Sequence, residues 1–243
     1  MICSKFDFRA LLLSASLIFG LMASTSVAHA ETGAKWRVNG ADVGSLAPQL
    51  EISEVENKTG SLSFTTKGGT SVLILCTATK FTEGGKLLAN GSISTARVLG
   101  TGCSVLLNEV AAPKCSPHSP GKLKGEILSE KITGLIVLSE GSDLVKFSPE
   151  KGTLYLSVEL GETCAIGEAV RVEAVTNEKG EVQGPYLKDC KGNAAFTEER
   201  VTHLVEEGPN RMVALGQPAK TIGSANFVLT GAHKGLSWSG VPA

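Results

Sequence analysis

Hydrophobic and polar residues alternate with a period of two along most of the chain. Within Thr153–Leu160, four apolar residues fall on one face, and Tyr155 shares the other face with polar side chains. Ala169–Val175 repeats the pattern, with Arg171 and Glu173 on its polar face. A β-strand that packs one face on a core and exposes the other to water has this period. The alternation therefore predicts a chain built mainly of amphipathic strands.

Two segments, Ser71–Cys76 and Gly134–Ser139, are apolar on both faces, as is typical of central strands that are covered on both sides. Turn-forming residues separate the strands at short intervals, beginning at Lys67, Glu83, Asn90, Glu140, Ser148 and Asn177. Many short strands with this spacing predict an all-β fold, either an antiparallel sandwich or a barrel-like domain. No repeat or change of composition divides residues 31–243, so we expect a single domain.

The segment Thr197–Asn210 fits two structures. Thr197 could cap a helix that ends at Gly208, because Val201 and Val205 would then share one helical face. The same two residues also alternate with polar neighbours, and the turn-forming residues before Arg211 suit a hairpin. We favour the hairpin.

The first thirty residues have the pattern of a secretory signal peptide. Lys5 and Arg9 precede the apolar run Leu11–Ala23, and Ala28 and Ala30 are small residues at the positions that a signal peptidase recognises. The apolar run is too short for a membrane anchor, which needs roughly 20 residues. We therefore expect cleavage after Ala30 and a secreted or cell-surface protein with no membrane span after cleavage.

Charge and aromatic content narrow the classes of partner. The formal net charge is −1, and no cluster of Lys and Arg occurs, so neither nucleic acid nor an anionic membrane surface is expected as a partner. Only 5% of the residues are aromatic, whereas sites that process sugars usually carry aromatic platforms. The partner that these observations leave open is an envelope polysaccharide or an extracellular protein.

Five cysteines follow the predicted cleavage site: Cys76, Cys103, Cys115, Cys164 and Cys190. Outside the cytoplasm cysteines usually form disulfides, and four paired cysteines with one left over allow fifteen arrangements. Cys103 and Cys115 form the pair that is easiest to defend, because a strand followed by a turn could bring them together. The spacing suits neither a zinc site nor a redox C-x-x-C motif, so no metal and no cofactor are predicted.

The sequence contains no motif of a known catalytic class, and we predict a protein without catalytic activity. A small secreted hydrolase is the alternative, and its triad would need His118, His203 or His233 beside a serine or a carboxylate. A pair of glutamates could also act on glycosides. His118 lies in the proline-rich segment Ala112–Lys122, which we interpret as an exposed loop with a solvated histidine. That loop is also a candidate for recognition by a protein partner.

Trp36 and Trp238 lie near the two ends of the chain that follows the signal peptide, and two interpretations fit them. They could form a surface platform for sugar rings, which would make the protein a polysaccharide-binding module. Alternatively, the terminal strands pair and each indole covers an end of the core. We favour the second interpretation. Exposure of Trp36, Trp238 or Tyr155 along one sheet face would favour the first.

The order of motifs resembles a group of uncharacterised exported, β-rich proteins of soil actinobacteria. The shared features include W-x-V-N-G at Trp36–Gly40, a strand that ends in Cys76, and G-C-S-V followed by a second cysteine and S-P-x-S-P-G within Gly102–Gly121. A G-L-I-V-L segment, an F-x-P-x-x-G-x-L segment and the tail Gly216–Gly240 also fit. The resemblance implies export and a β fold but no activity.

The resemblance also bears on the cysteines. Cys190 is an addition to the shared pattern, so the resemblance implies that Cys76, Cys103, Cys115 and Cys164 are the paired set. Taken together, the sequence predicts an exported, all-β, disulfide-linked domain with a binding or structural role at the cell envelope or outside the cell.

Overall fold

The structure, a computed structural model, describes residues 33–53, 60–139, 142–167, 169–178, 180, 182, 184, 186–187, 201–205 and 212–241. The predicted signal peptide and Cys190 lie outside these residues. Within the described ranges the strand pairings are antiparallel and the only helical element is the short 3-10 turn η1 (Gly231–His233). No helix in this part of the chain has the length and apolar character to cross a membrane. The prediction of an all-β, antiparallel fold is confirmed.

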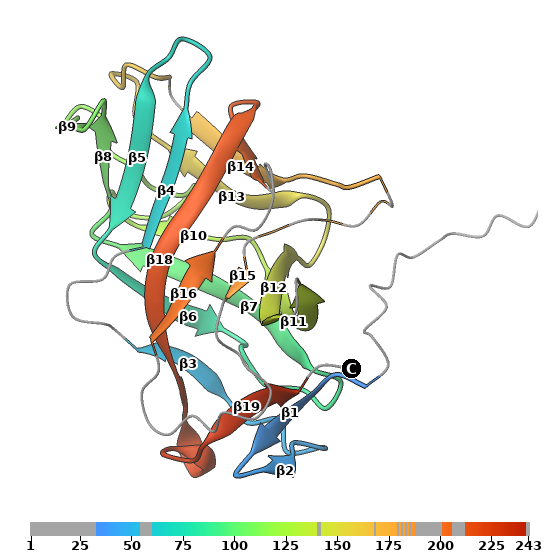
Figure 1. The fold of residues 1–243 in the computed structure, drawn as a ribbon. Helices are drawn as coiled ribbons and strands as arrows, with labels where there is room; N and C mark the ends of the chain where they lie inside the picture. Colours follow the sequence, from blue (N-terminus) through green and yellow to red (C-terminus); the bar gives the residue numbers. More distant parts are fainter. Residues whose placement is uncertain are drawn as a thin grey trace, which may run out of the picture.

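Eight strands form the upper sheet of Figure 1. Their order is β13 (Leu154–Glu159), β14 (Ala169–Ala174), β17 (Met212–Ala214), β18 (Gln217–Leu229), β4 (Gly60–Thr65), β5 (Ser71–Cys76), β8 (Ser104–Leu107) and β9 (Val110–Ala111). The predicted alternation holds in β14, where Val170, Val172 and Ala174 are buried and Arg171 is exposed.

A second group of strands curls into a half-barrel. Its order is β6 (Ala78–Glu83), β7 (Ser92–Thr101), β11 (Ile132–Ser139), β12 (Ser142–Pro149), β15 (Tyr186–Leu187), β16 (Val201–Val205), β18 and β3 (Leu50–Ser53), with β10 (Ile127–Leu128) paired to the end of β7. The backbone N–H of Leu50 donates to the carbonyl oxygen of Gly85 at 2.8 Å, and Gln49 forms a β-bridge with Lys86. These contacts bring β3 against the segment that follows β6.

The long strand β18 belongs to both groups. Its first half pairs with β17 and β4, and its second half pairs with β16 and β3. In Figure 1 it runs along most of the length of the molecule. A single continuous strand therefore fixes the upper sheet relative to the half-barrel.

The hairpin predicted around Gly208 is wrong, although the choice of strand over helix is confirmed for Val201–Val205. Strand β16 pairs with β15 and β18, and β17 pairs with β14 and β18, so β16 and β17 are not partners. Met212–Ala214 instead forms a hairpin with β18 through Leu215 and Gly216, which both have positive φ. A two-residue turn of this conformation matches the twist of the flanking strands.

The two ends of the described chain pair in a separate three-stranded sheet. Its order is β19 (Trp238–Val241), β1 (Lys35–Val38) and β2 (Ala41–Asp42), and it forms the lower end of the molecule in Figure 1. Trp36 is fully buried and Trp238 is 5% exposed, with their ring centroids 5.7 Å apart in an edge-to-face arrangement. The Trp36 indole also donates to the carbonyl oxygen of Ser92 at 2.9 Å, which fastens this sheet to β7.

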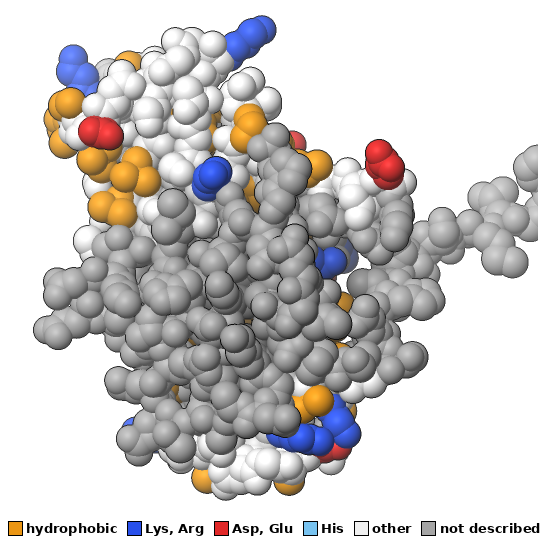
Figure 2. All heavy atoms as spheres, in the orientation of Figure 1, with side chains coloured by type: hydrophobic (Ala, Val, Ile, Leu, Met, Phe, Trp, Pro, Cys, Tyr) orange, Lys and Arg blue, Asp and Glu red, His pale blue; other side chains and the backbone are white. Residues whose placement is uncertain are grey.

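The opposite end of the molecule keeps part of its hydrophobic surface uncovered. Strand β5 is central, as predicted, but Leu73 and Leu75 on its outer face are only half-buried. Val110 in β9 is 69% exposed. Figure 2 shows hydrophobic side chains at the surface where β5, β8 and β9 lie. The prediction that both faces of Ser71–Cys76 are covered is therefore wrong for the outer face, because no second layer packs there among the described residues.

Candidate ligand-binding site

A hollow of about 160 Å³ lies where the upper sheet meets the half-barrel. Strands β4, β5, β13 and β18 contribute residues from the upper sheet, and β6, β7 and β10 contribute residues from the half-barrel. The surface of the hollow is almost entirely apolar, and six aliphatic side chains supply most of it: Leu62, Ile74, Val98, Ile127, Leu156 and Val158. No charged side chain lines it. A molecule in the hollow would therefore contact an uncharged, apolar surface.

The disulfide between Cys76 and Cys103 closes one side of the hollow. Cys76 ends β5 and Cys103 precedes β8, and because Leu75 pairs with Ser104 the two cysteines are cross-strand neighbours. A Cβ atom on Gly100 would lie 2.8 Å from the Cys76 Sγ. Glycine at position 100 is therefore what allows the sulfur atoms to pack directly on the backbone of β7.

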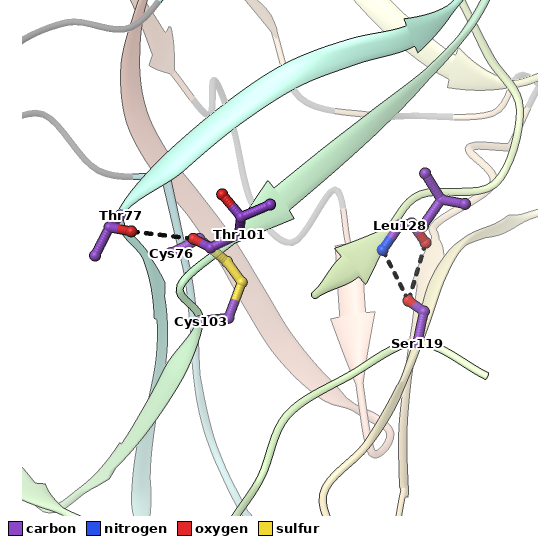
Figure 3. The surroundings of a disulfide bond; sticks show 6 residues. All are labelled: Cys76, Thr77, Thr101, Cys103, Ser119 and Leu128. Atoms are coloured by element: carbon purple, nitrogen blue, oxygen red, sulfur yellow. Dashed lines mark hydrogen bonds between the residues drawn. A yellow bond between two sulfur atoms is a disulfide. The ribbon is translucent and has the colours of Figure 1, made fainter. Parts of the chain in front are cut away.

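Figure 3 shows the hydrogen bonds around this disulfide. The Thr77 hydroxyl donates to the carbonyl oxygen of Thr101 at 3.2 Å, and the Thr77 N–H donates to the same oxygen at 3.0 Å. Gly102 has φ of +61°, and a Cβ atom there would collide with the Thr77 hydroxyl. The junction at which β7 continues into β8 is thus held on both sides of the disulfide.

The second disulfide joins Cys115 to Cys164. The prediction that Cys103 pairs with Cys115 is wrong, whereas the paired set implied by the resemblance matches the two bonds in the structure. The physical reason is that the Ser116 N–H donates to the carbonyl oxygen of Leu160 at 2.8 Å. The loop that carries Cys115 is therefore held against the end of β13, next to Cys164.

The proline-rich segment Ala112–Lys122 is not an exposed loop at its centre. Pro117 is buried and Ser119 is 5% exposed. The Ser119 hydroxyl accepts from the Leu128 N–H at 2.9 Å (Figure 3). It also lies 2.9 Å from the carbonyl oxygen of Ser157. This segment connects β10 to β13, so its central residues have a structural role in the fold.

His118 does meet a carboxylate, which is what a hydrolase would require. Its Nε2 lies 3.1 Å from Glu159 Oε2, and its Nδ1 lies 2.8 Å from the carbonyl oxygen of Ser116. The side chain is 19% exposed, so the prediction of a solvated histidine is wrong. Both ring nitrogens face oxygen acceptors, and neither is left to take a proton from a serine hydroxyl. In this arrangement the partners of His118 are the Glu159 carboxylate and the Ser116 carbonyl oxygen, and not a serine hydroxyl.

The other predicted residues are scattered through the fold. His233 is half-buried in η1, and the side chain of His203 lies outside the described residues. Trp36, Trp238 and Tyr155 are buried, so their rings do not form an exposed surface for sugar binding. Tyr155 lies on the face predicted to be polar, but its hydroxyl donates to the carbonyl oxygen of Phe147 inside the protein.

No sequence motif points to the hollow, since its lining residues are spread from Gly60 to Thr221. Two glycines in strands, Gly60 at the start of β4 and Gly100 within β7, are the signal that could have indicated it. A Cβ atom on Gly60 would lie 3.2 Å from the Thr79 side chain, and Gly100 packs on the disulfide. Glycine within a strand often marks a close approach of another segment.

The chain was compared with known proteins at the level of families, sequences and structures. No protein-family model matches the chain, and neither the curated proteins nor the solved structures contain a match.

Proposed function

We propose that the protein is exported and acts outside the cytoplasm as a binding domain without catalytic activity. The observation that carries this proposal is an apolar hollow with a disulfide in its wall. Disulfides of this kind persist in oxidising compartments, and a concave apolar site is the usual form of a small-molecule pocket. The predicted signal peptide at residues 1–30 and the resemblance to exported actinobacterial proteins favour the same compartment.

Two other functions have less support. A polysaccharide-binding module would need exposed aromatic rings, and Trp36, Trp238 and Tyr155 are buried. A secreted hydrolase built on a triad would need a histidine with a nitrogen available to a nucleophile, and His118 directs both of its nitrogens to other oxygen atoms. A pair of glutamates acting on glycosides does not depend on a histidine and is tested by the turnover of glycosides below. Each of these functions becomes an outcome of the experiment below.

The compartment is tested first, by expressing the full chain in a bacterium with a general secretion pathway and fractionating the cells. We expect the exported form to begin at Glu31 by mass spectrometry. We expect four cysteines to resist alkylation until a reductant is added. An Ala30→Arg variant, which disrupts the cleavage site, should remain unprocessed. Unprocessed protein in the cytoplasm with all six cysteines open to alkylation would refute export.

Binding is tested next with the oxidised, exported protein. It is incubated with cell-envelope material, with insoluble polysaccharides and with a lipid extract, and each mixture is sedimented or analysed by native mass spectrometry. We expect a non-covalent complex with a component of the lipid extract. Pelleting with a polysaccharide that soluble sugar reverses would instead identify a polysaccharide-binding module. Turnover of glycoside or ester substrates would identify a hydrolase.

A further inference from the structure

We propose that the hollow binds a small, uncharged, hydrophobic molecule about the size of one six-membered ring or the end of a branched alkyl chain. This inference rests on the proposed binding function and names the chemical class of its ligand. It follows from the volume of the hollow, from the chemistry of its wall and from the way the wall is held.

The volume sets the size of the ligand. In another protein, an engineered cavity of about 150 Å³ lined by aliphatic and aromatic side chains stays dry and binds benzene or xenon. The present hollow has a volume of about 160 Å³ and a comparable aliphatic lining. A single ring or a short branched chain fills such a space.

The wall sets the polarity of the ligand. A charged group inside the hollow would lose its hydration and find no ionic partner, because no charged side chain lines the site. The Ser129 hydroxyl is already engaged, since it accepts from the Val98 N–H at 2.9 Å and donates to the carbonyl oxygen of Glu130 at 2.8 Å. Thr79 adds a hydroxyl-bearing side chain to the wall. The site therefore suits a hydrocarbon or a molecule with one neutral polar group.

Water is a poor occupant of the same space. A buried water molecule typically makes about three hydrogen bonds to polar groups that otherwise have no partner. The wall instead presents methyl and methylene groups from Leu62, Ile74, Val98, Leu156 and Val158 over most of its area. A hydrophobic ligand would cover these groups without breaking hydrogen bonds.

The wall is also held in place before a ligand arrives. The disulfide Cys76–Cys103 joins β5 to the start of β8, and Gly100 packs on its sulfur atoms. Val98 and Leu156 line the hollow and are only half-buried. A preformed site of this kind avoids the ordering cost that a collapsed site would impose on binding.

Toluene is the probe for the first test, with glucose as the polar control. The oxidised, exported protein is labelled with ¹³C at its methyl groups and titrated while methyl spectra are recorded. We expect saturable shifts of the methyl signals of Ile74, Val98, Leu156 and Val158, and no shifts with glucose. Absence of saturable shifts up to the solubility limit of toluene would overturn the inference.

Variants locate the binding site. Val98→Phe should fill the hollow and weaken toluene binding at least tenfold. The matched control, Val110→Phe, introduces the same ring at an exposed position and should bind toluene as the parent does. Thermal unfolding checks that both variants fold, and Leu156→Phe replaces Val98→Phe if the latter does not. Unchanged toluene binding in a folded, filled variant would place the probe elsewhere and overturn the inference.

The size of the site gives an independent readout. Val98→Ala should enlarge the hollow and shift its preference from toluene to naphthalene by at least threefold, and equal preference in the two proteins would count against the assignment. The ligand class and the proposed function can fail separately. A protein that is exported and binds envelope material but ignores toluene would refute only the ligand class. A protein retained in the cytoplasm that still binds toluene would refute only the exported role.

Discussion

Two tight turns place a leucine and a glutamate in the left-handed region of backbone conformation. Leu215 has φ of +51° between β17 and β18, and Glu109 has φ of +67° between β8 and β9. A residue with a Cβ atom is strained there by roughly 1–2 kcal/mol, and asparagine tolerates it better than leucine or glutamate. The turn between β1 and β2 uses Asn39 and Gly40, the pair best suited to this geometry.

Replacing these strained residues should therefore stabilise the protein. We expect Glu109→Gly and Leu215→Asn each to raise the free energy of unfolding by about 0.5–1 kcal/mol, as measured by denaturant titration. Gly40→Ala is the matched control, because Gly40 has φ of +76° and open space around it. It should lower the free energy of unfolding through the backbone alone. Destabilisation by Glu109→Gly would show that the turn does not strain this residue.

Asp42 is the residue whose titration depends most directly on its neighbours. The Lys35 Nζ at 2.6 Å and the Arg37 Nε at 3.1 Å hold the pKa of its carboxyl below the usual range. A pKa that is lower in the folded than in the unfolded protein adds stability above the unfolded value, and the gain is lost as the pH falls through the folded value. Because the carboxyl is exposed, this contribution is small.

The Asp42 carboxyl signal can be followed by NMR across an acid titration. Lys35→Met should raise the pKa of Asp42, because it removes the shorter of the two ion pairs that this carboxylate forms. Lys67→Met, which removes an exposed lysine from a distant turn, should leave the titration unchanged. A pKa that is the same in the parent and in Lys35→Met would contradict the ion pair seen in the structure.

At the level of elements, the segment Ala112–Lys122 depends on the buried hydroxyl of Ser119. This hydroxyl accepts from the Leu128 N–H, and its removal would leave a buried donor without a partner. We expect Ser119→Ala to lower the free energy of unfolding by about 2 kcal/mol. Ser104→Ala alters an exposed serine of β8 and should have almost no effect. The unfolding free energies of the two variants are compared by chemical denaturation under the same conditions. Equal values would show that the Ser119 hydroxyl does not stabilise this segment.

Strands could be predicted from the sequence, but their partners could not. The period of two in Ala169–Val175 records which face is buried, and β14 confirms it. The same pattern says nothing about pairing, so Val201–Val205 was expected to pair in a hairpin and instead lies between β15 and β18. The alternation also misplaced Tyr155, because its hydroxyl finds a buried carbonyl oxygen and an apparently polar position becomes part of the core.

At the level of the whole molecule, the hollow and the disulfide pattern are properties of the folded arrangement. The hollow forms only when the curl of the half-barrel brings β6, β7 and β10 against the upper sheet. Taken one strand at a time, its aliphatic lining residues give no sign of the site. The pairing of Cys76 with Cys103 likewise follows from the register of β5 with β8, which the sequence does not encode locally. Composition and spacing could therefore predict disulfides but not which cysteines join.

The two disulfides should contribute similarly to stability but differently to the hollow. They close loops of 27 and 49 residues, which corresponds to about 3.5 and about 4 kcal/mol in the chain-entropy account. Cys76 lines the hollow, whereas Cys115 and Cys164 lie apart from it. Two double variants separate these effects: Cys76→Ala/Cys103→Ala and Cys115→Ala/Cys164→Ala. They should lose similar amounts of unfolding free energy, but only the first removes a residue that lines the hollow.

We expect both double variants to lose about 3–4 kcal/mol of unfolding free energy in denaturant titrations. Only the first should weaken toluene binding, by at least tenfold in the methyl titration, because it removes the sulfur atoms that pack on Gly100 and the bond that holds β5 to the start of β8. The second should bind toluene as the parent does at a temperature where it is folded. Equal loss of binding in the two variants would show that the hollow responds to global stability and that the Cys76–Cys103 bond has no specific role in its wall.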